Sequence, residues 1–333
     1  MRTHKPAGAK SSCSRSAPLP LIALIFAAVA PAVSAPYPER PIRIVIGYSA
    51  GGPADVSTRV ISQTLSQDWK QQIIVDNRPS AGGILGAQMV AGATTDGYTL
   101  LSVTASHAVA PAIYSKLPYD TVKDFAGITT TISTPSVLVV APLLGVKSVK
   151  ELVVLAKAKP GELLFSSGGI GSATHFVAEL FNSMAGIRAV HVPYKGNPEA
   201  LTDVVTSRVQ YNMAPVPNTA ALAKDGKIIP LGVSSSKRLL TLPDVPTIDE
   251  SGLPGFLWGT WFGWLAPAKT PHALIVRLNA EIARVAELPA MRERWAVFGG
   301  DPLRMAPEQF DRHIVEQIAL FTKLAKGANI KAD

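Results

Sequence analysis

The stretch Ile42–Asp55, IRIVIGYSAGGPAD, combines a short apolar strand with a glycine-rich turn and the start of a helix. Its centre, Gly47-Tyr48-Ser49-Ala50-Gly51, matches G-x-S-x-G, which in α/β-hydrolases places a nucleophilic serine on a sharp strand-to-helix turn. The same arrangement presents backbone N–H groups at the positive end of a helix dipole, where anions bind. The stretch therefore predicts either a catalytic Ser49 or an anion-binding loop.

The surrounding sequence gives the hydrolase interpretation little context. Residues 42–46 form the first expected strand after the N-terminal segment, so no earlier strand supplies the upstream oxyanion loop of that mechanism. His107, His175 and His191 follow Ser49 in the chain, but no HGGG-type segment is present. A secreted serine hydrolase acting through Ser49 stays an alternative, and we expect no enzymatic activity.

Loops similar to this one recur along the chain. Residues 49–52 and 80–83 both read Ser-Ala-Gly-Gly, and residues 166–169 read Ser-Ser-Gly-Gly. Each follows an expected strand and precedes an expected helix, which places it at the carboxyl end of a strand, where open α/β sheets bind ligands. Ordinary strand-to-helix turns also use glycine for its backbone freedom. Three similar loops in one chain favour a shared ligand site.

Short apolar strands alternate with helical segments, which predicts an α/β fold with largely parallel sheets. The expected strands cover residues 42–46, 73–75, 99–103, 136–141, 163–165, 189–192, 209–213, 229–233 and 262–265. The expected helices cover residues 55–67, 84–91, 148–159, 174–184, 198–206, 271–286 and 307–326. Ser148 and Glu151 have the spacing of a capping box, which marks one helix start.

The first 35 residues have the layout of a secretory signal peptide. A basic segment precedes the apolar run Leu19–Ala30, and small residues follow it. The run is shorter than the roughly 20 residues that a membrane-spanning helix needs, although an uncleaved anchor is the alternative. Cys13, the only cysteine, precedes the run, so the exported chain would contain no disulfide. We therefore expect cleavage of residues 1–35 and a periplasmic protein.

Charge and motifs exclude several function classes. The formal net charge is +8, and residues 1–35 carry four basic and no acidic residues, which leaves +4 for the rest. Because no Lys/Arg run is present, we expect no nucleic-acid binding, and the mild positive charge suits an anionic ligand. The sequence has no P-loop and no H-E-x-x-H spacing, so we expect neither a metal nor a cofactor.

Ordered segments of the chain resemble the substrate-binding proteins of tripartite tricarboxylate transporters, the Bug-type periplasmic receptors. The resemblance covers almost everything after residue 35, and its order and spacing are more specific than any one segment. It is carried by Tyr37–Ile42, Gly51–Asp55, Asn77–Pro79, Ala81–Gly83, Gly86, Asp96–Leu100, Leu117–Asp120, Asp124–Phe125, Ser167–His175, His191–Gly196, Leu242–Thr247, Glu250 and Gly252.

The resemblance implies a fold and a division of the chain. The fold is the α/β periplasmic-binding-protein fold of type II, in which two lobes joined by two crossing segments close on a ligand like a flytrap. Residues 36–137 and 260–333 would form the first lobe, and residues 138–259 the second. The resemblance implies no catalysis.

The resemblance also implies ligand-binding residues from both lobes. The first lobe would contribute Tyr48, Ser49, Ala50, Gly51, Gly52 and Asp55, with Ala81, Gly82, Ser106 and His107 nearby. The second lobe would contribute Ser167, Gly168, Gly171, Ser172, Thr174, His175, Tyr194, Lys195 and Gly196. Charge-assisted hydrogen bonds of such groups to a carboxylate contribute about 1.5–3 kcal/mol each. Asp55 also fits a second role, since carboxylates favour the first turn of a helix.

We therefore expect a monomeric receptor that delivers a small organic carboxylate to membrane transporter subunits. A ligand sensor that uses the same fold is a further alternative. Trp258, Trp261 and Trp264 recur at every third residue, and we expect them to pack in the core, as aromatic stripes usually do. The alternative is an aromatic wall for a ligand or a docking face.

Overall fold

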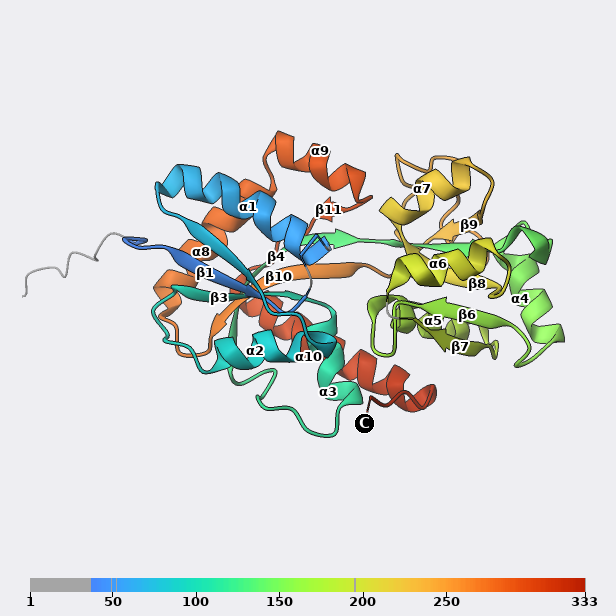
Figure 1. Ribbon diagram of the computed structural model, residues 1–333, viewed down its shortest axis with the longest axis horizontal. Helices are drawn as coiled ribbons and strands as arrows, with labels where there is room; N and C mark the ends of the chain where they lie inside the picture. Colours follow the sequence, from blue (N-terminus) through green and yellow to red (C-terminus); the bar gives the residue numbers. More distant parts are fainter. Residues whose placement is uncertain (1–36, 49, 52, 195, 333) are drawn as a thin grey trace, which may run out of the picture. The chain divides into compact units, whose positions relative to one another are not determined.

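The strand β1 (Ile42–Ile46) lies inside a six-stranded sheet, here called the first sheet (Figure 1). Every residue of this strand except Arg43 is buried, as expected for a strand covered on both faces. The strand order is β11-β4-β10-β3-β1-β2. The strands are β1 (Ile42–Ile46), β2 (Ile73–Asn77), β3 (Thr99–Thr104), β4 (Phe125–Thr134), β10 (Thr260–Pro267) and β11 (Asp301–Pro302).

The second sheet has five strands in the order β7-β6-β8-β5-β9. They are β5 (Ser136–Val140), β6 (Leu164–Ser167), β7 (Val190–Pro193), β8 (Tyr211–Pro215) and β9 (Ile229–Val233). Together the two sheets confirm the α/β two-sheet architecture that the sequence predicted.

This computed structural model describes residues 37–48, 50–51, 53–194 and 196–332. The expected signal peptide and the predicted site residues Ser49, Gly52 and Lys195 lie outside the described residues. Residues 38–333 form one compact unit. Within the described ranges, no helix is both long and apolar enough to cross a membrane.

Helices cover both faces of each sheet (Figure 1). Figure 1 shows α1 and α8 on one side of the first sheet, and α2, α3 and α10 on the other. In the second sheet, α4 and α5 pack in one apolar cluster, and α6 and α7 pack in another. The helical segments are α1 (Pro53–Trp69), η1 (Ala81–Gly83), α2 (Ile84–Ala91), α3 (Ser106–Ile113), η2 (Pro142–Leu144), α4 (Val149–Ala158), α5 (Ala173–Ala185), α6 (Asn197–Val205), α7 (Val216–Lys224), α8 (His272–Ala286), α9 (Pro289–Val297) and α10 (Pro307–Gly327).

The expectation of largely parallel sheets is wrong, because both sheets are mixed. β1 runs parallel to β2 and β3, and β6 runs parallel to β7 and β8, as strand–helix–strand units require. β10 is antiparallel to β3 and β4, and β5 is antiparallel to β8 and β9. β5 and β10, which run antiparallel to both of their neighbours, are the first strands after each connection between the sheets. β5 follows β4 directly, and β10 follows the connection that leaves β9.

Two connections join the sheets, as expected. β4 ends at Thr134 and β5 begins at Ser136, so Pro135 alone lies between them. The chain returns from β9 to β10 through residues 234–259. The predicted lobe boundaries stay a prediction, because α10 contacts elements of both sheets. Its Phe321 ring lies 5.2 Å from the ring of Phe176 in α5.

The tryptophans of the β10 region are all buried, which agrees with the packing interpretation. Trp261 and Trp264 are each 2% exposed, and Trp258 is 6% exposed. The indole ring of Trp258 lies 5.7 Å from the Phe321 ring, and that of Trp261 lies 5.4 Å from Phe310. Trp258 and Trp261 therefore join α10 to the segment that returns from the second sheet.

Candidate functional site

Side chains hold the turn between β1 and α1 in place. The Asp55 carboxylate is buried, accepts the Gly51 N–H at 2.9 Å and accepts Arg59 Nε at 2.9 and 3.0 Å. Asn77, at the end of β2, donates to Asp55 Oδ1 at 3.0 Å and to the Tyr48 carbonyl at 3.1 Å. Arg59 completes the ring by donating to Asn77 Oδ1 at 2.9 Å. Asp55 is thus occupied by the protein itself, as its first-turn role predicts.

The protonation of Asp55 follows from this network. Burial raises the pKa of its carboxyl, but the hydrogen bonds from Arg59, the Gly51 N–H and Asn77 outweigh burial, so the pKa lies below its usual value. The carboxylate is therefore charged at neutral pH.

Glycines let the first two loops approach each other. A Cβ on Gly47 would lie 2.4 Å from the Gly83 Cα, so only glycine fits this close contact. Tyr48, the next residue, points its hydroxyl to Thr104, whose Oγ1 donates to it at 3.1 Å. Burial raises the pKa of Tyr48, so its hydroxyl stays protonated. The hydroxyl donates to the Gly82 carbonyl at 3.5 Å, a contact long enough to be exchanged for a bond to an anion.

The loop between β6 and α5 is built from hydrogen bonds within itself. Ser172 caps α5 by accepting the His175 N–H at 3.2 Å. The Gly168 N–H donates to Thr174 Oγ1 at 2.9 Å, and the Gly171 N–H donates to His175 Nδ1 at 3.3 Å. Gly171 has a φ of 77°, which favours glycine. The loop therefore keeps its shape without a ligand.

A pair of histidines supports this loop from beneath. The rings of His175 and His191 stack with centroids 3.7 Å apart, and His191 Nε2 lies 2.6 Å from the buried Ser167 hydroxyl. Burial lowers the pKa of His191 to about 4, and burial together with His191 lowers the pKa of His175 to about 3. Both rings are therefore neutral at pH 7.

The loops of the two sheets meet at a cavity of about 340 Å³. A Cβ on Gly171 would lie 2.4 Å from Ile113 Cδ1, so the β6–α5 loop touches α3 of the first sheet. The lining residues are Tyr48, Ser80, Gly82, Ser106, Val109, Ala110, Ile113, Tyr114, Gly168, Ile170, Gly171 and Ser172. The first-sheet loops and the second-sheet loop thus share one crevice.

A second cavity, of about 220 Å³, shares Tyr48 with the first. It is lined by Tyr48, Ala54, Thr104, Thr134, Pro135, Ser136, Ala173, Thr174, Pro215, Thr260 and Phe262. Ala54 lies in the first turn of α1, Ala173 and Thr174 begin α5, and Pro215 caps α7. Helix N-termini from both sheets therefore face this space. We call the two cavities together the crevice.

The structure brings only part of the predicted set to the crevice walls. Tyr48, Gly82, Ser106, Gly168, Gly171, Ser172 and Thr174 line it. Ala81 lies beside Gly82 in η1, and Ala50 and Gly51 lie in the exposed turn before α1. Asp55, Ser167 and His175 are buried behind the loops that they support.

Other predicted residues contact neither cavity. His107 is buried against Tyr119 and Phe125, at ring distances of 6.1 and 5.1 Å, and burial lowers its pKa to about 4. Tyr194 donates to Asp203 at 2.5 Å, and burial together with this acceptor raises its pKa to about 12. Gly196 caps α6, behind the β6–α5 loop.

Sequence reasoning missed several crevice residues. Ser80, Thr104, Pro135, Pro215 and Ile113 line it, although none belongs to the predicted set. A signal was available for two of them, because Ser80 opens the second glycine loop and Thr104 directly follows the expected strand at residues 99–103. Ile113 and Pro135 carry no local signal.

Comparisons with known proteins agree with this geometry. The sequence model of the family described as 'Tripartite tricarboxylate transporter family receptor' matches residues 57–330 of this chain. The chain belongs to this receptor family. Protein BugT of Bordetella pertussis, strain Tohama I, is 33% identical to the receptor over 93% of this chain and 97% of its own.

Solved structures of similar proteins have the same fold. The receptor is similar to R. palustris Rpa4515, determined with adipate, at a TM-score of 0.78 and 32% identity over 89% of this chain and 99% of that one. It is also similar to MatC from Rhodopseudomonas palustris with bound malate, at a TM-score of 0.73 and 29% identity, covering 86% and 99% of the two chains. The family consists of solute-binding receptors, and the hydrolase alternative is not favoured.

The described side chains also bear on metal binding. Among them, no group of three or more His, Cys, Asp or Glu residues is placed to hold a metal ion.

Proposed function

We propose that the receptor is periplasmic, that it binds a small organic carboxylate in the crevice between two lobes, and that it delivers this ligand to the membrane subunits of a tripartite tricarboxylate-type transporter. The lobes would be those that the sequence predicts, with boundaries near residues 137 and 259. Its relatives were determined with adipate and malate, both dicarboxylates.

The observation that carries the proposal is the convergence of helix N-termini on the 220 Å³ cavity. The first N–H groups of a helix have no partner within it, and the positive end of the helix dipole favours an anion. Ala54 supplies such a group from α1, and Ala173 and Thr174 supply two from α5. An anion here would therefore interact with helices of both sheets at once.

The internal bonding of the β6–α5 loop refines the expected donors. The N–H groups of Gly168 and Gly171 are already engaged by Thr174 and His175. We infer that these glycines shape the wall, while the N-terminus of α5 and the Tyr48 hydroxyl donate to the carboxylate. A ligand that touches both sheets stabilises the arrangement in which both sets of contacts exist.

Binding of a carboxylate and of its uncharged analogue tests the proposal. We would measure thermal stabilisation and calorimetric affinity with adipate, malate and adipamide, which matches adipate in length but has no charge. A dicarboxylate is expected to raise the melting temperature in proportion to the logarithm of its concentration above Kd, and adipamide is not. The proposal fails if adipamide stabilises the receptor as well as adipate does, or if no carboxylate in a panel of mono-, di- and tricarboxylates stabilises it.

The transport step needs a separate measurement. Capture of the transporter's membrane subunits by the immobilised receptor should increase when the carboxylate is present. Capture of a signalling protein instead would favour the sensor alternative.

A further inference from the structure

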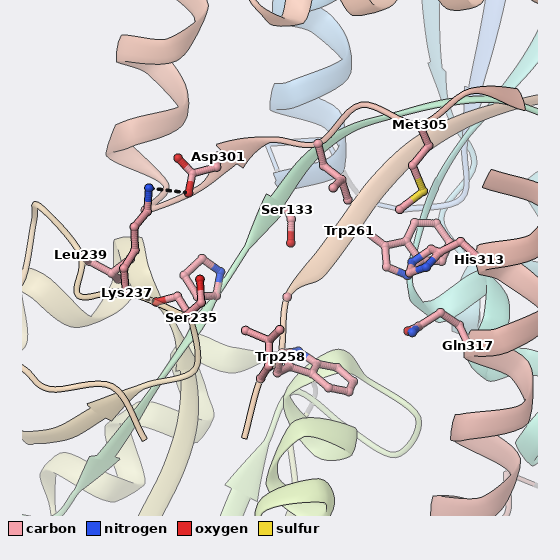
Figure 2. Close-up of a pocket in the computed structure, with 16 residues that line it drawn as sticks. Ser133, Ser235, Lys237, Leu239, Trp258, Trp261, Asp301, Met305, His313 and Gln317 are labelled. Carbon is pink, nitrogen blue, oxygen red and sulfur yellow. Dashed lines mark hydrogen bonds and ion pairs between the residues drawn. The ribbon is translucent and has the colours of Figure 1, made fainter. Parts of the chain in front are cut away.

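A third cavity, of about 370 Å³, lies behind the crossing strands, and we call it the back cavity (Figure 2). Successive side chains of a strand point to opposite faces. On β4, Ser133 lines the back cavity and Thr134 lines the crevice. On β10, Trp261 lines the back cavity, while Thr260 and Phe262 line the crevice. The back cavity is therefore a separate site on the opposite face of the same two strands.

The walls of the back cavity come from both sheets. Figure 2 shows Ser235, Lys237 and Leu239, which follow β9, opposite residues of the first sheet and α10. Trp261, Met305, His313 and Gln317 gather at one end of the space. A volume of 370 Å³ is within the range of small-molecule sites, roughly 300–1,000 Å³.

Two residues that line this cavity carry a buried polar atom with no partner among the described residues. The Trp261 side chain is 2% exposed, and its Nε1–H donates to no described acceptor. His313 Nε2 is likewise unpartnered, and its ring meets that of Trp261 edge to face at 5.6 Å. Buried polar atoms in proteins almost always have a hydrogen-bond partner. Because an indole N–H can only donate, a partner for Trp261 must bring an acceptor.

The other walls favour an uncharged, flat ligand. Trp258, Leu257 and Met305 offer aromatic, aliphatic and thioether surfaces, which suit an aromatic ring. The acidic and basic side chains of the lining, Asp301 and Lys237, pair with each other at 3.7 Å at the far end of the cavity. Burial lowers the pKa of His313, so its ring is neutral at pH 7. The lining thus leaves no charge uncompensated.

We propose that the back cavity binds a small uncharged aromatic molecule with a carbonyl-type acceptor, whose oxygen accepts the Trp261 Nε1–H while its ring packs against Trp258 and Met305. Gln317 can pair with the rest of the polar group. The site is distinct from the carboxylate crevice in both position and charge preference.

Binding of a ligand in the back cavity is expected to change the affinity of the crevice for its own ligand. Pro135 lines both cavities, and the walls of the back cavity come from both sheets. A ligand that fits this arrangement of the sheets favours it over others, and by reciprocity the crevice ligand favours binding at the back.

Calorimetry and NMR titration of the purified receptor with benzamide, benzoate and toluene test the proposal. Benzamide has the ring and the acceptor, toluene lacks the acceptor, and benzoate adds a charge. We expect benzamide to bind about fivefold to tenfold more tightly than toluene, the difference that one buried hydrogen bond makes. Benzamide should not displace adipate from the receptor.

Trp261→Phe removes the N–H and keeps a ring. We expect this variant to lose the preference for benzamide over toluene, while Trp264→Phe, the same change three residues along β10 and outside the cavity lining, keeps it. If Trp261→Phe does not fold, Ser236→Trp at an exposed wall position fills the space and should weaken benzamide binding at least tenfold. The proposal is overturned if Trp261→Phe keeps the preference for benzamide, or if Ser236→Trp binds benzamide with full affinity. It is also overturned if benzamide competes with adipate. If the parent receptor binds no benzamide, the proposal fails and water is the partner of the buried N–H.

Discussion

Gly171 of the β6–α5 loop lies so close to Ile113 of α3 that a single added Cβ would come within 2.4 Å of the Ile113 Cδ1. This contact joins an element of the second sheet to an element of the first beside the crevice. The absence of a side chain at residue 171 therefore sets how closely the two crevice walls approach.

A matched pair of glycine substitutions isolates this contact. Gly171 and Gly145 have φ values of 77° and 76°, but a Cβ on Gly145 meets no atom within 4 Å. Both alanine variants should lose about 1–2 kcal/mol of stability to the positive φ. Only Gly171→Ala should also weaken adipate binding, by at least tenfold, and Gly171→Val should abolish it. Calorimetry and thermal melts of both variants provide the measurement.

The double variant Gly171→Ala with Ile113→Ala extends this test. Removing the Ile113 side chain relieves the clash, so part of the lost adipate affinity should return. If Gly171→Ala binds adipate as Gly145→Ala does, the close contact has no part in binding.

Tyr48→Phe removes the hydroxyl that lies at the junction of the two crevice cavities. We expect adipate binding to weaken by roughly tenfold to 150-fold, the effect of one hydrogen bond to a charged group. Tyr98→Phe is the matched control, because its hydroxyl accepts the Glu39 N–H near the exposed surface, away from the crevice. Equal affinities of the two variants would show that Tyr48 only supports the wall.

Asp55→Asn disrupts the hydrogen-bond ring that holds the turn before α1. We expect a loss of about 1–3 kcal/mol in the free energy of unfolding, since the charge-assisted bonds from Arg59 and Gly51 weaken. Asp68→Asn changes an exposed carboxylate that pairs with Arg284, and should cost well under about 1 kcal/mol. Urea denaturation at pH 7 gives both values, and equal losses would contradict the assigned role of Asp55.

The buried histidines predict a loss of stability in acid. Burial holds the pKa values of His107 and His191 near 4 and that of His175 near 3, below the ordinary 6.5. The unfolded chain therefore takes up more protons below pH 6.5, and stability that is complete above this pH falls as the pH drops towards 4. Each histidine contributes about 1 kcal/mol per pH unit in this window.

Denaturation curves between pH 4 and 7.5 check this slope. His107→Phe, which fits the ring cluster of Tyr119 and Phe125, should make the slope shallower without changing adipate affinity at pH 7. A parent slope in His107→Phe would contradict the assignment.

The sequence predicted the features that depend on neighbouring residues. The glycine loop at 80–83 follows β2 and leads into α2, as its composition indicates. The segment 166–169 begins with the last two residues of β6 and precedes α5. Ser148 caps α4 at the predicted position. The length of α2 is also as predicted, over Ile84–Ala91. These features rest on backbone freedom and capping, which a few adjacent residues determine.

Other features depend on partners that are distant in sequence. α3 contains Pro111 in its last turn, and β4 contains three successive threonines, so neither segment has a clear apolar period. The predicted site residue His107 lies in the core because Tyr119 and Phe125 pack around it. The direction of a side chain, and hence its presence in the crevice, is decided by contacts that local patterns do not contain.

Pro135 is the whole of one connection between the sheets, since β4 ends and β5 begins on either side of it. Proline fixes its own φ near −65°, and it restricts the residue before it to extended conformations. Few torsions on this connection are therefore free to change when the sheets move. At this connection, a change in the angle between the two sheets would be limited to the few backbone torsions on either side of Pro135.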